Sequence, residues 1–322
     1  MALMSYAQAA AAALAEAMRA DRNVVALGED LGRGGIFGQY RGLQQEFGAE
    51  RVIDTPISEA TIMGAAVGMA LAGLRPVVEM RVVDFALCAM DELVNQAAKN
   101  RYMFGGQGRV PLVARMPIGL WTASAAQHSQ SLEAWFAHVP GLAVVAPSMP
   151  ADNYGLLGSA LESGDPVVYL EHKELWGVEG DVEPGVRVPL GAARIVRGGT
   201  DVTLVSWSKA MQTCVDAATE LARAGISVEV IDLRTIWPWD RATVLGSAAR
   251  TGALLVVHEA VQVGGFGAEI AATAAEETGC RVRRLGAPRI PSGYAKPLED
   301  ESRVTVAQVV AAARSLAAHN GG

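Results

Sequence analysis

The 322-residue sequence has few cysteines and few charged residues, and it has no long apolar run. Its three cysteines, Cys88, Cys214 and Cys280, are far apart and odd in number, which argues against a disulfide framework and against a zinc site. No apolar run reaches the roughly 20 residues that a membrane-spanning helix needs. The sequence therefore predicts a protein without membrane spans, and a reducing cytoplasm is the compartment that fits best.

Basic charge is also scarce. The chain has 27 Lys and Arg against 34 Asp and Glu, a net charge of -7, and no Lys/Arg cluster. This balance argues against nucleic acid as a partner. Hydrophobic residues make up 51% and charged residues 19%, which is typical of a well-buried globular chain, and the length suffices for two domains with sizeable cores.

The usual phosphate-binding fingerprints are missing. Glycines crowd residues 31–38, but their spacing is not G-x-G-x-x-G and no G-K-[ST] follows, which favours a plain turn. A second glycine turn, 264–267, precedes a predicted helix and could bind an anion there. Because it too lacks a full fingerprint, a tight turn without a ligand is favoured.

The apolar stretch 7–14 is as short as the core of a signal peptide. No basic segment precedes it and charged residues follow at once, so it predicts a helix that begins near Ser5. Beyond it, strand-like and helical runs alternate along the whole chain, including one long helix at 84–103. Such alternation predicts parallel sheets covered by helices on both faces, an α/β doubly wound fold.

The composition turns polar between residues 177 and 191, with Pro184, Pro189 and several glycines. This segment is the predicted linker. It would separate a first domain, residues 1–176, from a second and smaller one, residues 192–322, in which the alternation of strands and helices resumes.

The stretch 54–60 lies where a short strand ends and an apolar helix, 60–73, begins. That helix is apolar on nearly every face, which predicts that it is buried all round. Ser58 is the expected N-cap, and Glu59 follows in the first turn, where the helix dipole favours an anion. Glu59 either serves only that dipole or is a carboxylate that faces a ligand at a strand-to-helix switch.

A set of short motifs follows one order along the chain. They are Gly28-Glu29-Asp30, residues 54–59, Asp84-Phe85, residues 95–99, Arg101-Tyr102, residues 127–130, 140–142, 166–168 and 232–234. This ordered set resembles the beta subunit of the thiamine-diphosphate-dependent decarboxylase component of 2-oxoacid dehydrogenase complexes, including the acetoin dehydrogenase branch. The resemblance runs nearly end to end. It implies a pyrimidine-binding domain followed by a transketolase C-terminal-like domain that mainly builds subunit contacts.

The resemblance also implies roles for residues of the first domain. Glu59 corresponds to the carboxylate that pairs with N1' of the aminopyrimidine of thiamine diphosphate. That pairing favours the imino tautomer, which removes the proton from C2 of the thiazolium ring. Phe85 corresponds to the aromatic residue that stacks on the aminopyrimidine, and Ile57 and Met80 would line the same pocket.

Three further residues are implied in catalysis or substrate binding. His128 corresponds to the histidine that faces the substrate, as an acid/base or to orient a carboxylate. Glu29 corresponds to an acidic residue that links paired active sites through protons, although it could be an ordinary charged residue at a strand end. Arg81 departs from the neutral residue expected there, and it could hold a substrate carboxylate or merely pair with Asp84.

Two other features bear on the substrate and on ions. Trp121 and Thr122 are bulkier than the small residues usual before the histidine motif, which puts the usual substrate in doubt. The family often carries a monovalent cation of the potassium type on carbonyl oxygens, for which a plain loop is the alternative. The corresponding positions are Leu112, Ala160, Leu161, Ser163 and Asp165.

Thiamine-diphosphate enzymes bind the diphosphate through Mg²⁺ held by a G-D-G motif and a downstream Asn, and no G-D-G occurs in this sequence. The sequence therefore predicts an alpha subunit that holds Mg²⁺ and shares the cofactor, in an α2β2 heterotetramer, with a homodimer when the chain is expressed alone. The predicted reaction decarboxylates a 2-oxoacid, or cleaves acetoin, and passes the acyl group to a lipoyl-bearing acyltransferase. The alternatives are half of a split transketolase-like or carboligase enzyme that works without lipoamide, and a non-catalytic assembly subunit.

Overall fold

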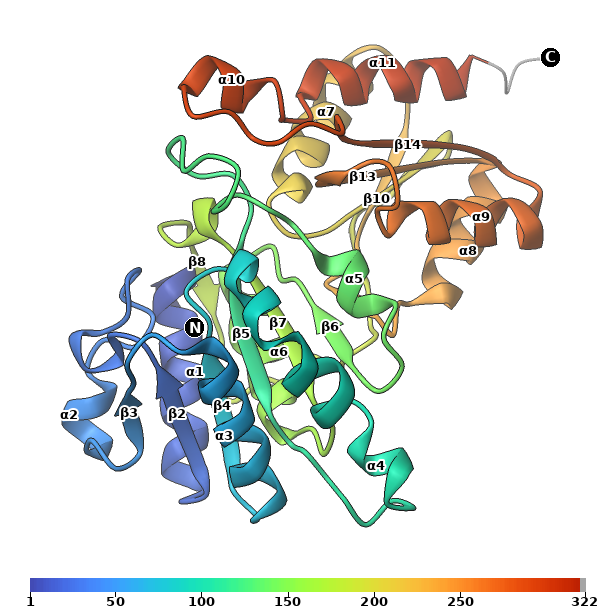
Figure 1. Ribbon diagram of the computed structural model, residues 1–322. Coiled ribbons are helices and arrows are strands. Elements are labelled where there is room, and N and C mark those ends of the chain that lie inside the picture. Colours follow the sequence, from blue (N-terminus) through green and yellow to red (C-terminus); the bar gives the residue numbers. More distant parts are fainter. Residues whose placement is uncertain (319–322) are drawn as a thin grey trace. The chain divides into compact units, whose positions relative to one another are not determined.

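The computed structural model describes residues 1–318, and the chain divides into two compact units (Figure 1). The first comprises Met1–Ile118 and Trp135–Leu190. The second comprises Gly119–Ala134 and the chain from Gly191 onward. Each unit has an apolar core of its own. The grouping of segment 119–134 with the second unit is a feature that the sequence did not suggest.

The first unit contains a parallel sheet with strands in the order β6–β7–β5–β4–β2–β3. Its strands are nearly continuous apolar runs because both faces of the sheet are covered. They are β2 (Val24–Gly28), β3 (Val52–Asp54), β4 (Arg75–Glu79), β5 (Val113–Ile118), β6 (Ala143–Val145) and β7 (Val167–His172). The chain passes from β2 to β3 on one side and then returns to β4 on the other. That reversal is a topological switch point, where α/β sheets bind ligands beyond the carboxyl ends of their strands.

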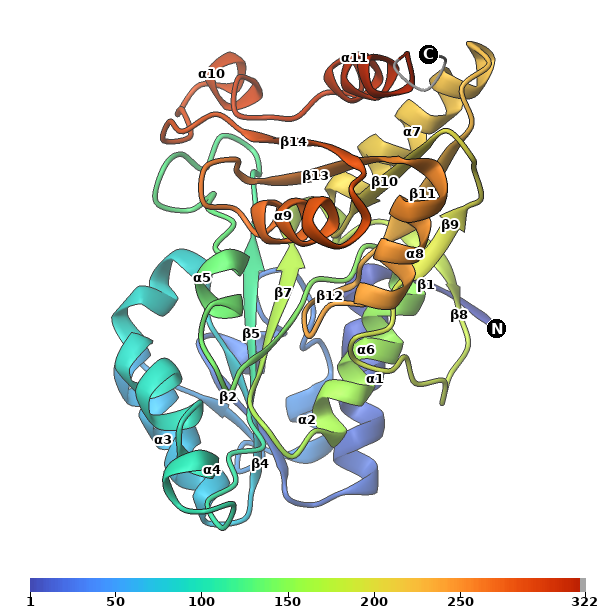
Figure 2. The same ribbon diagram turned by 90° about the vertical axis from the view of Figure 1, so that its right-hand side faces the viewer.

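Helices lie on both faces of this sheet. Figure 2 shows α3 and α4 on one side and α1 and α6 on the other. The helices are α1 (Tyr6–Ala20), α2 (Leu43–Phe47), α3 (Glu59–Leu71), α4 (Asn100–Met103), α5 (Glu133–Ala137) and α6 (Pro150–Glu162). The helix predicted to begin near Ser5 is confirmed, because the Ser5 hydroxyl accepts from the backbone of Gln8 and the Gln8 side chain accepts from Ser5 in return.

The long helix predicted at 84–103 is wrong in detail. The segment is helical but divided into a 3-10 helix, Val83–Ala89, a π-helix, Asp91–Ala97, and α4. Leu93 is buried, as the predicted face requires, whereas Leu87 is 39% exposed. A 3-10 helix has fewer residues per turn than an α-helix, so it rotates Leu87 away from that face.

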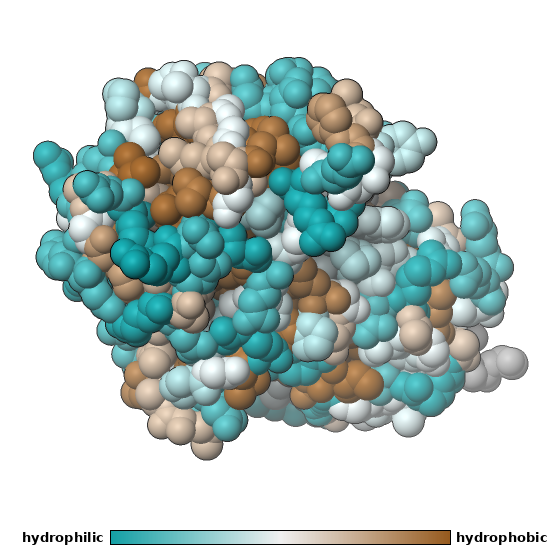
Figure 3. Space-filling model, turned by 90° about the horizontal axis from the view of Figure 1, so that it is seen from below, coloured by the Kyte–Doolittle hydropathy of each residue, from teal (hydrophilic) through white to brown (hydrophobic). Residues whose placement is uncertain are grey.

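The expected burial of the helix after Glu59 is also wrong. Helix α3 buries one side, which carries Ile62, Met63, Ala66, Val67 and Ala70. The other side, with Ala65 and Gly68, is solvent-accessible, and Leu71 is 50% exposed. An apolar helix sequence predicts that the helix is buried, but it does not tell whether the same chain or another subunit buries it. Seen from below, one face of the molecule shows hydrophobic patches between hydrophilic ones (Figure 3).

The N-terminal residues form a strand that the sequence did not suggest. Strand β1 (Ala2–Ser5) pairs antiparallel with β8 (Glu179–Val182), so the predicted linker 177–191 contains regular structure. The polar composition of this segment gave no sign of a strand. The strand forms because pairing satisfies its backbone groups, and only Val182 of β8 is buried.

The second unit has a sheet in the order β14–β13–β10–β11–β9, parallel except for the antiparallel edge strand β9. The strands of this sheet are β9 (Arg194–Arg197), β10 (Val202–Ser206), β11 (Val228–Asp232), β13 (Ala253–Val261) and β14 (Arg281–Ala287). The short strand β12 (Thr235–Trp237) is not part of this sheet. Its helices are α7 (Ala210–Arg223), α8 (Arg241–Thr251), α9 (Gly267–Thr278), α10 (Lys296–Asp300) and α11 (Val306–Ala317). Within residues 1–318 no helix combines the length and the apolar character needed to cross a bilayer.

Candidate active site

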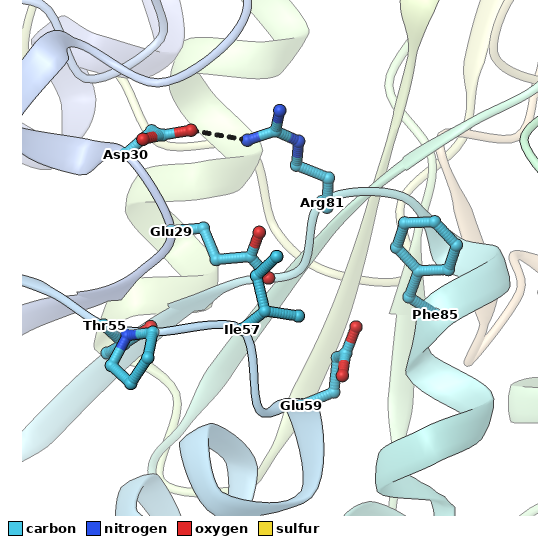
Figure 4. A pocket seen from close by; sticks show the side chains of 8 residues that line it. Glu29, Asp30, Thr55, Ile57, Glu59, Arg81 and Phe85 are labelled. Atoms are coloured by element: carbon cyan, nitrogen blue, oxygen red, sulfur yellow. Dashed lines mark hydrogen bonds and ion pairs between the residues drawn. The ribbon is translucent and has the colours of Figure 1, made fainter.

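A pocket of about 330 Å³ opens at the switch point of the first sheet (Figure 4). Three loops, which follow β2, β3 and β4, form it together with the start of α3 and the 3-10 helix. The side chains that line it are Glu29, Asp30, Thr55, Pro56, Ile57, Glu59, Arg81 and Phe85. The predicted site residues Glu29, Ile57, Glu59, Arg81 and Phe85 are thus brought together although they are spread over 57 positions of the sequence.

Glu59 opens helix α3 and is half-buried. The preceding Ser58 occupies the N-cap position but does not cap the helix, because its hydroxyl donates to the Thr61 hydroxyl over 2.8 Å. In Figure 4 the Glu59 carboxylate points into the pocket, with Ile57 and Phe85 on either side. Among residues 1–318 this carboxylate makes no hydrogen bond and no ion pair, so its oxygens can accept from a ligand.

Glu29, which follows β2, places a second carboxylate in the same pocket. Burial raises its pKa, and the negative charges of Glu59 and Asp30 act in the same direction while Arg81 opposes them. Glu29 therefore keeps its proton to a higher pH than an ordinary glutamate. Within the described chain it also lacks a hydrogen-bond partner.

Arg81, which follows β4, pairs with Asp30. Its Nη1 donates to Asp30 Oδ2 over 2.7 Å, and this bond lowers the pKa of Asp30. The guanidinium points toward Asp30 and away from Glu59 and Phe85 (Figure 4). The alternative of a pair with Asp84 is wrong, since the two loop ends after β2 and β4 bring Asp30 to the arginine instead.

The apolar lining is uneven. Phe85 is half-buried and faces the pocket, whereas Ile57 is 77% exposed. Met80, which was expected to line the pocket, is only 1% exposed and is absent from the set of lining side chains given above. It lies in the core at the end of β4, where a strand side chain that points inward cannot also face the ligand space.

His128 lies on segment 119–134 of the second unit and is exposed. Its backbone N–H donates to the carbonyl of Ala125 over 3.3 Å. The turn that precedes it has left-handed backbone at three residues that are not glycine: Thr122 (φ 47°), Ala123 (φ 56°) and Ala125 (φ 65°).

Three of the five positions expected to hold a monovalent cation, Leu161, Ser163 and Asp165, are engaged by arginines. Arg75 donates to the carbonyl oxygen of Leu161 over 3.1 Å and to that of Ser163 over 2.9 Å. Arg101 donates to the carboxylate of Asp165. Fixed positive charge therefore contacts these oxygens. For Mg²⁺ the fit is no better, because residues 1–318 contain no group of three His, Cys, Asp or Glu suited to a metal ion.

A buried polar network that the sequence reasoning missed lies in the same sheet. Arg115 on β5 donates through Nε and Nη2 to Glu171 on β7, over 2.8 and 2.9 Å, and both side chains are at most 1% exposed. Glu79 at the end of β4 accepts from Gln39 and from Tyr40, each over 2.9 Å. Burial raises the pKa of Glu79 to about 7, against the charge of Arg115. Charged residues inside apolar strands were the signal that could have revealed it.

The comparisons with known proteins cover both units. Residues 2–178 match the family model described as "Transketolase, pyrimidine binding domain" and residues 191–309 the one described as "Transketolase, C-terminal domain". By structure, the chain is similar to "Split gene transketolase, inactive beta4 tetramer", with a TM-score of 0.83, 23% identity and 98% of each chain covered, a likeness that concerns the fold alone. The predicted α/β fold class is confirmed.

Three relatives are similar to this chain in sequence over nearly its whole length. The subunit beta of acetoin:2,6-dichlorophenolindophenol oxidoreductase from Cupriavidus necator is 41% identical, with 94% of each chain covered. The pyruvate dehydrogenase E1 component subunit beta of Rhizobium meliloti is 42% identical, over 98% of this chain and 70% of the relative. The 2-oxoisovalerate dehydrogenase subunit beta of Bacillus subtilis is 39% identical, over 98% and 99%.

These similarities confirm the resemblance read from the ordered motifs, and they agree with a pocket at the switch point of a pyrimidine-binding domain. The chain belongs to the family of beta subunits of thiamine-diphosphate-dependent 2-oxoacid and acetoin dehydrogenases.

Proposed function

We propose that this chain pairs with an alpha subunit, shares thiamine diphosphate with it, and decarboxylates a 2-oxoacid or cleaves acetoin, so that the acyl group passes to a lipoyl-bearing acyltransferase. One observation carries the proposal. Glu59 and Glu29 face one pocket at the switch point of the sheet, and neither carboxylate has a hydrogen-bond partner within residues 1–318. Carboxylates that are partly buried and unpartnered in a cleft are candidates for contact with a ligand.

The lining of the pocket fits the aminopyrimidine half of the cofactor. Glu59, in the first turn of α3, would accept a hydrogen bond from the ring. Phe85 offers the face of an aromatic ring, and Ile57, 77% exposed, is an apolar side chain that a bound ring would cover. When bound, thiamine diphosphate supplies a carbon nucleophile at C2 of its thiazolium ring.

Glu29, His128 and Arg81 have assigned roles in this proposal. Glu29, whose pKa is raised by burial, would exchange protons with Glu59 or with solvent. His128 would act on the substrate as an acid/base or orient its carboxylate. Arg81, held by Asp30, would set the charge around Glu29 more than it would bind substrate.

The partner is expected to supply what this chain lacks. The described residues hold no metal-binding cluster, so we assign Mg²⁺ and the diphosphate to the alpha subunit. The exposed side of α3, with Ala65, Gly68 and Leu71, is a surface of small and apolar residues that a partner subunit would cover. We propose an α2β2 heterotetramer, with a homodimer as the form of this chain alone.

A monovalent cation plays at most a small part in this proposal. The carbonyl oxygens of Leu161 and Ser163 already accept from Arg75, whose charge substitutes for that of an ion. Activity of the reconstituted enzyme should therefore differ little between potassium and choline salts.

The proposal is tested with the purified alpha–beta pair. Pyruvate, branched-chain 2-oxoacids and acetoin are each supplied with and without a lipoyl acceptor, and turnover is measured against added thiamine diphosphate and Mg²⁺. We expect turnover of one of these substrates that needs the cofactor, the alpha chain and the lipoyl acceptor. Transfer to a sugar or aldehyde without lipoamide would support a carboligase instead, and no turnover that depends on this chain would support an assembly subunit.

A further inference from the structure

The turn before His128 concentrates unfavourable backbone. Of the six non-glycine residues with positive φ that the structure describes, three lie between positions 122 and 125. A side chain with a Cβ disfavours this left-handed region, because the Cβ approaches the neighbouring carbonyl. Backbone of this kind persists only where surrounding contacts enforce it.

A carboxylate of the same unit holds the left-handed backbone at the centre of the turn. The backbone N–H of Ala123, itself left-handed, donates to Oε2 of Glu299 in α10. Glu299 is only 1% exposed, and its other oxygen accepts from Arg303 Nη2 over 2.7 Å. The acceptor is therefore buried, and its ion pair with Arg303 fixes its direction.

The two ends of the segment are held in the same way. On the N-terminal side, the Leu120 N–H donates to Glu259 Oε1 over 2.8 Å. On the C-terminal side, Glu133, 1% exposed, accepts from Trp207 Nε1 over 3.1 Å. Segment 119–134 is thus held by the carboxylates of Glu259 and Glu299 and by that of its own Glu133, which binds Trp207.

Trp207 packs on His258, and His258 packs against the glycine turn 264–267. The Trp207 ring stacks on His258, with centroids 5.3 Å apart and 23° between the planes. A Cβ at Gly265 would lie 2.6 Å from the His258 ring, and one at Gly267 would lie 2.8 Å from it. These glycines are required by close packing on the histidine that supports Trp207, which gives the turn 264–267 a structural role.

We propose that Glu299 is a positioning residue: it holds the left-handed turn 122–125 and so sets the orientation of His128. This inference rests on the proposed role of His128 and deepens it, because it assigns control of a substrate-facing group to a residue of the C-terminal unit. Glu299, unlike Glu259 and Glu133, contacts a residue with left-handed backbone directly.

The test compares Glu299→Ala and Glu299→Gln with Glu301→Gln in the reconstituted alpha–beta enzyme. Glu301 is the matched control, since it is an exposed carboxylate two positions along the same segment. Hydrogen exchange of the 119–134 peptide, read at the Ala123 amide, should accelerate at least about tenfold in Glu299→Ala. Turnover should fall about tenfold or more in kcat with KM nearly unchanged, as misplacement of a reacting group predicts.

Glu299→Gln keeps an acceptor oxygen, so it should lie between Glu299→Ala and the wild type in both measurements. If the alanine variant fails to fold, Glu299→Gln still allows hydrogen exchange and kcat to be measured. Ala123→Gly placed in the Glu299→Ala background should restore part of kcat, because glycine adopts the left-handed backbone without the Cβ clash.

The outcomes separate this inference from the proposed function. Unchanged exchange at Ala123 in both Glu299 variants would overturn it, and so would faster exchange with unchanged kcat when His128→Ala is inactive. If His128→Ala itself keeps full activity, the proposed role of His128 fails and the positioning role fails with it. Faster exchange and lower kcat in the Glu299 variants, with Glu301→Gln like the wild type, would support it.

Discussion

Two groups of glutamates lie in the first unit, and they differ in how their charge is met. Glu171 and Glu79 are buried, and every oxygen that they present accepts from a named donor, among them Arg115 and Tyr40. Glu59 and Glu29 are half-buried, face a pocket of about 330 Å³, and have no hydrogen-bond donor within residues 1–318.

This difference in hydrogen bonding distinguishes glutamates that stabilise the sheet from glutamates that can bind a ligand. A buried charge without a partner is too costly to persist, so the first group must be satisfied internally and has nothing left for a ligand. The second group keeps its oxygens available because water can reach them until a ligand does. Only two positions along the chain, from Glu79 to Arg81, separate the closed network from the open pocket.

The largest effect on stability is expected where the closed network is broken. Arg115→Met should lower the free energy of unfolding by about 3–5 kcal/mol, because Glu171 would keep a buried charge without its partner. Urea denaturation of the reconstituted enzyme measures the change. The double variant Arg115→Met/Glu171→Met replaces the pair by apolar side chains and should recover most of the loss. A double variant no more stable than Arg115→Met would contradict the explanation.

The next effect concerns pH. The pKa of Glu79 is about 7 in the folded chain and 4.5 in the reference state, so between these values the folded state holds a proton that the unfolded state has lost. Its contribution to stability is therefore complete below about pH 4.5 and is lost as the pH rises through about 7. Glu79→Gln mimics the protonated form, so its stability should fall less with rising pH than that of the wild type.

A shift of this size corresponds to about 3 kcal/mol, which is an upper bound for the difference between the two stability profiles. Free energies of unfolding at about pH 5 and about pH 8 give the comparison. Parallel profiles for the variant and the wild type would show that the pKa of Glu79 is the same in the folded and unfolded states, and would contradict this prediction.

The smallest effect is expected at the rim of the pocket. Arg81 and Asp30 are 35% and 45% exposed, and solvent screens a pair of this kind. Arg81→Gln should therefore leave the free energy of unfolding nearly unchanged. Because the guanidinium points away from Glu59 and Phe85, KM for the substrate should change less than about threefold. A rise in KM of tenfold or more at constant kcat would show instead that Arg81 binds the substrate carboxylate.

Local patterns predicted much of the fold. The alternation around β10 and α7 and the Ser5 cap of α1 depend on neighbouring residues, and the structure agrees with them. Helix α3 shows the limit, because its apolar sequence could not distinguish burial in this chain from burial against another subunit. The π-helix Asp91–Ala97 also left no signal in the periodicity.

The candidate site was only partly predictable. The resemblance implied one pocket lined by Glu59, Phe85, Ile57 and Met80. The pocket in the structure is lined by the first three and by Glu29, but not by Met80. The pairing of Arg81 with Asp30 joins residues 51 positions apart, and the hold of Glu299 on Ala123 joins residues 176 apart. Contacts at such separations depend on how strands and loops meet in space, which the spacing of residues along the chain does not encode.

The central claim is that the open carboxylate of Glu59 prepares the cofactor for reaction. The most direct measurement is the rate at which the C2 hydrogen of thiamine diphosphate exchanges with D₂O in the reconstituted alpha–beta enzyme. Glu59→Gln should slow this exchange about 100-fold or more while the assembly and the affinity for cofactor persist, and the exposed Glu50→Gln should match the wild type. Exchange in Glu59→Gln as fast as in the wild type would contradict the account.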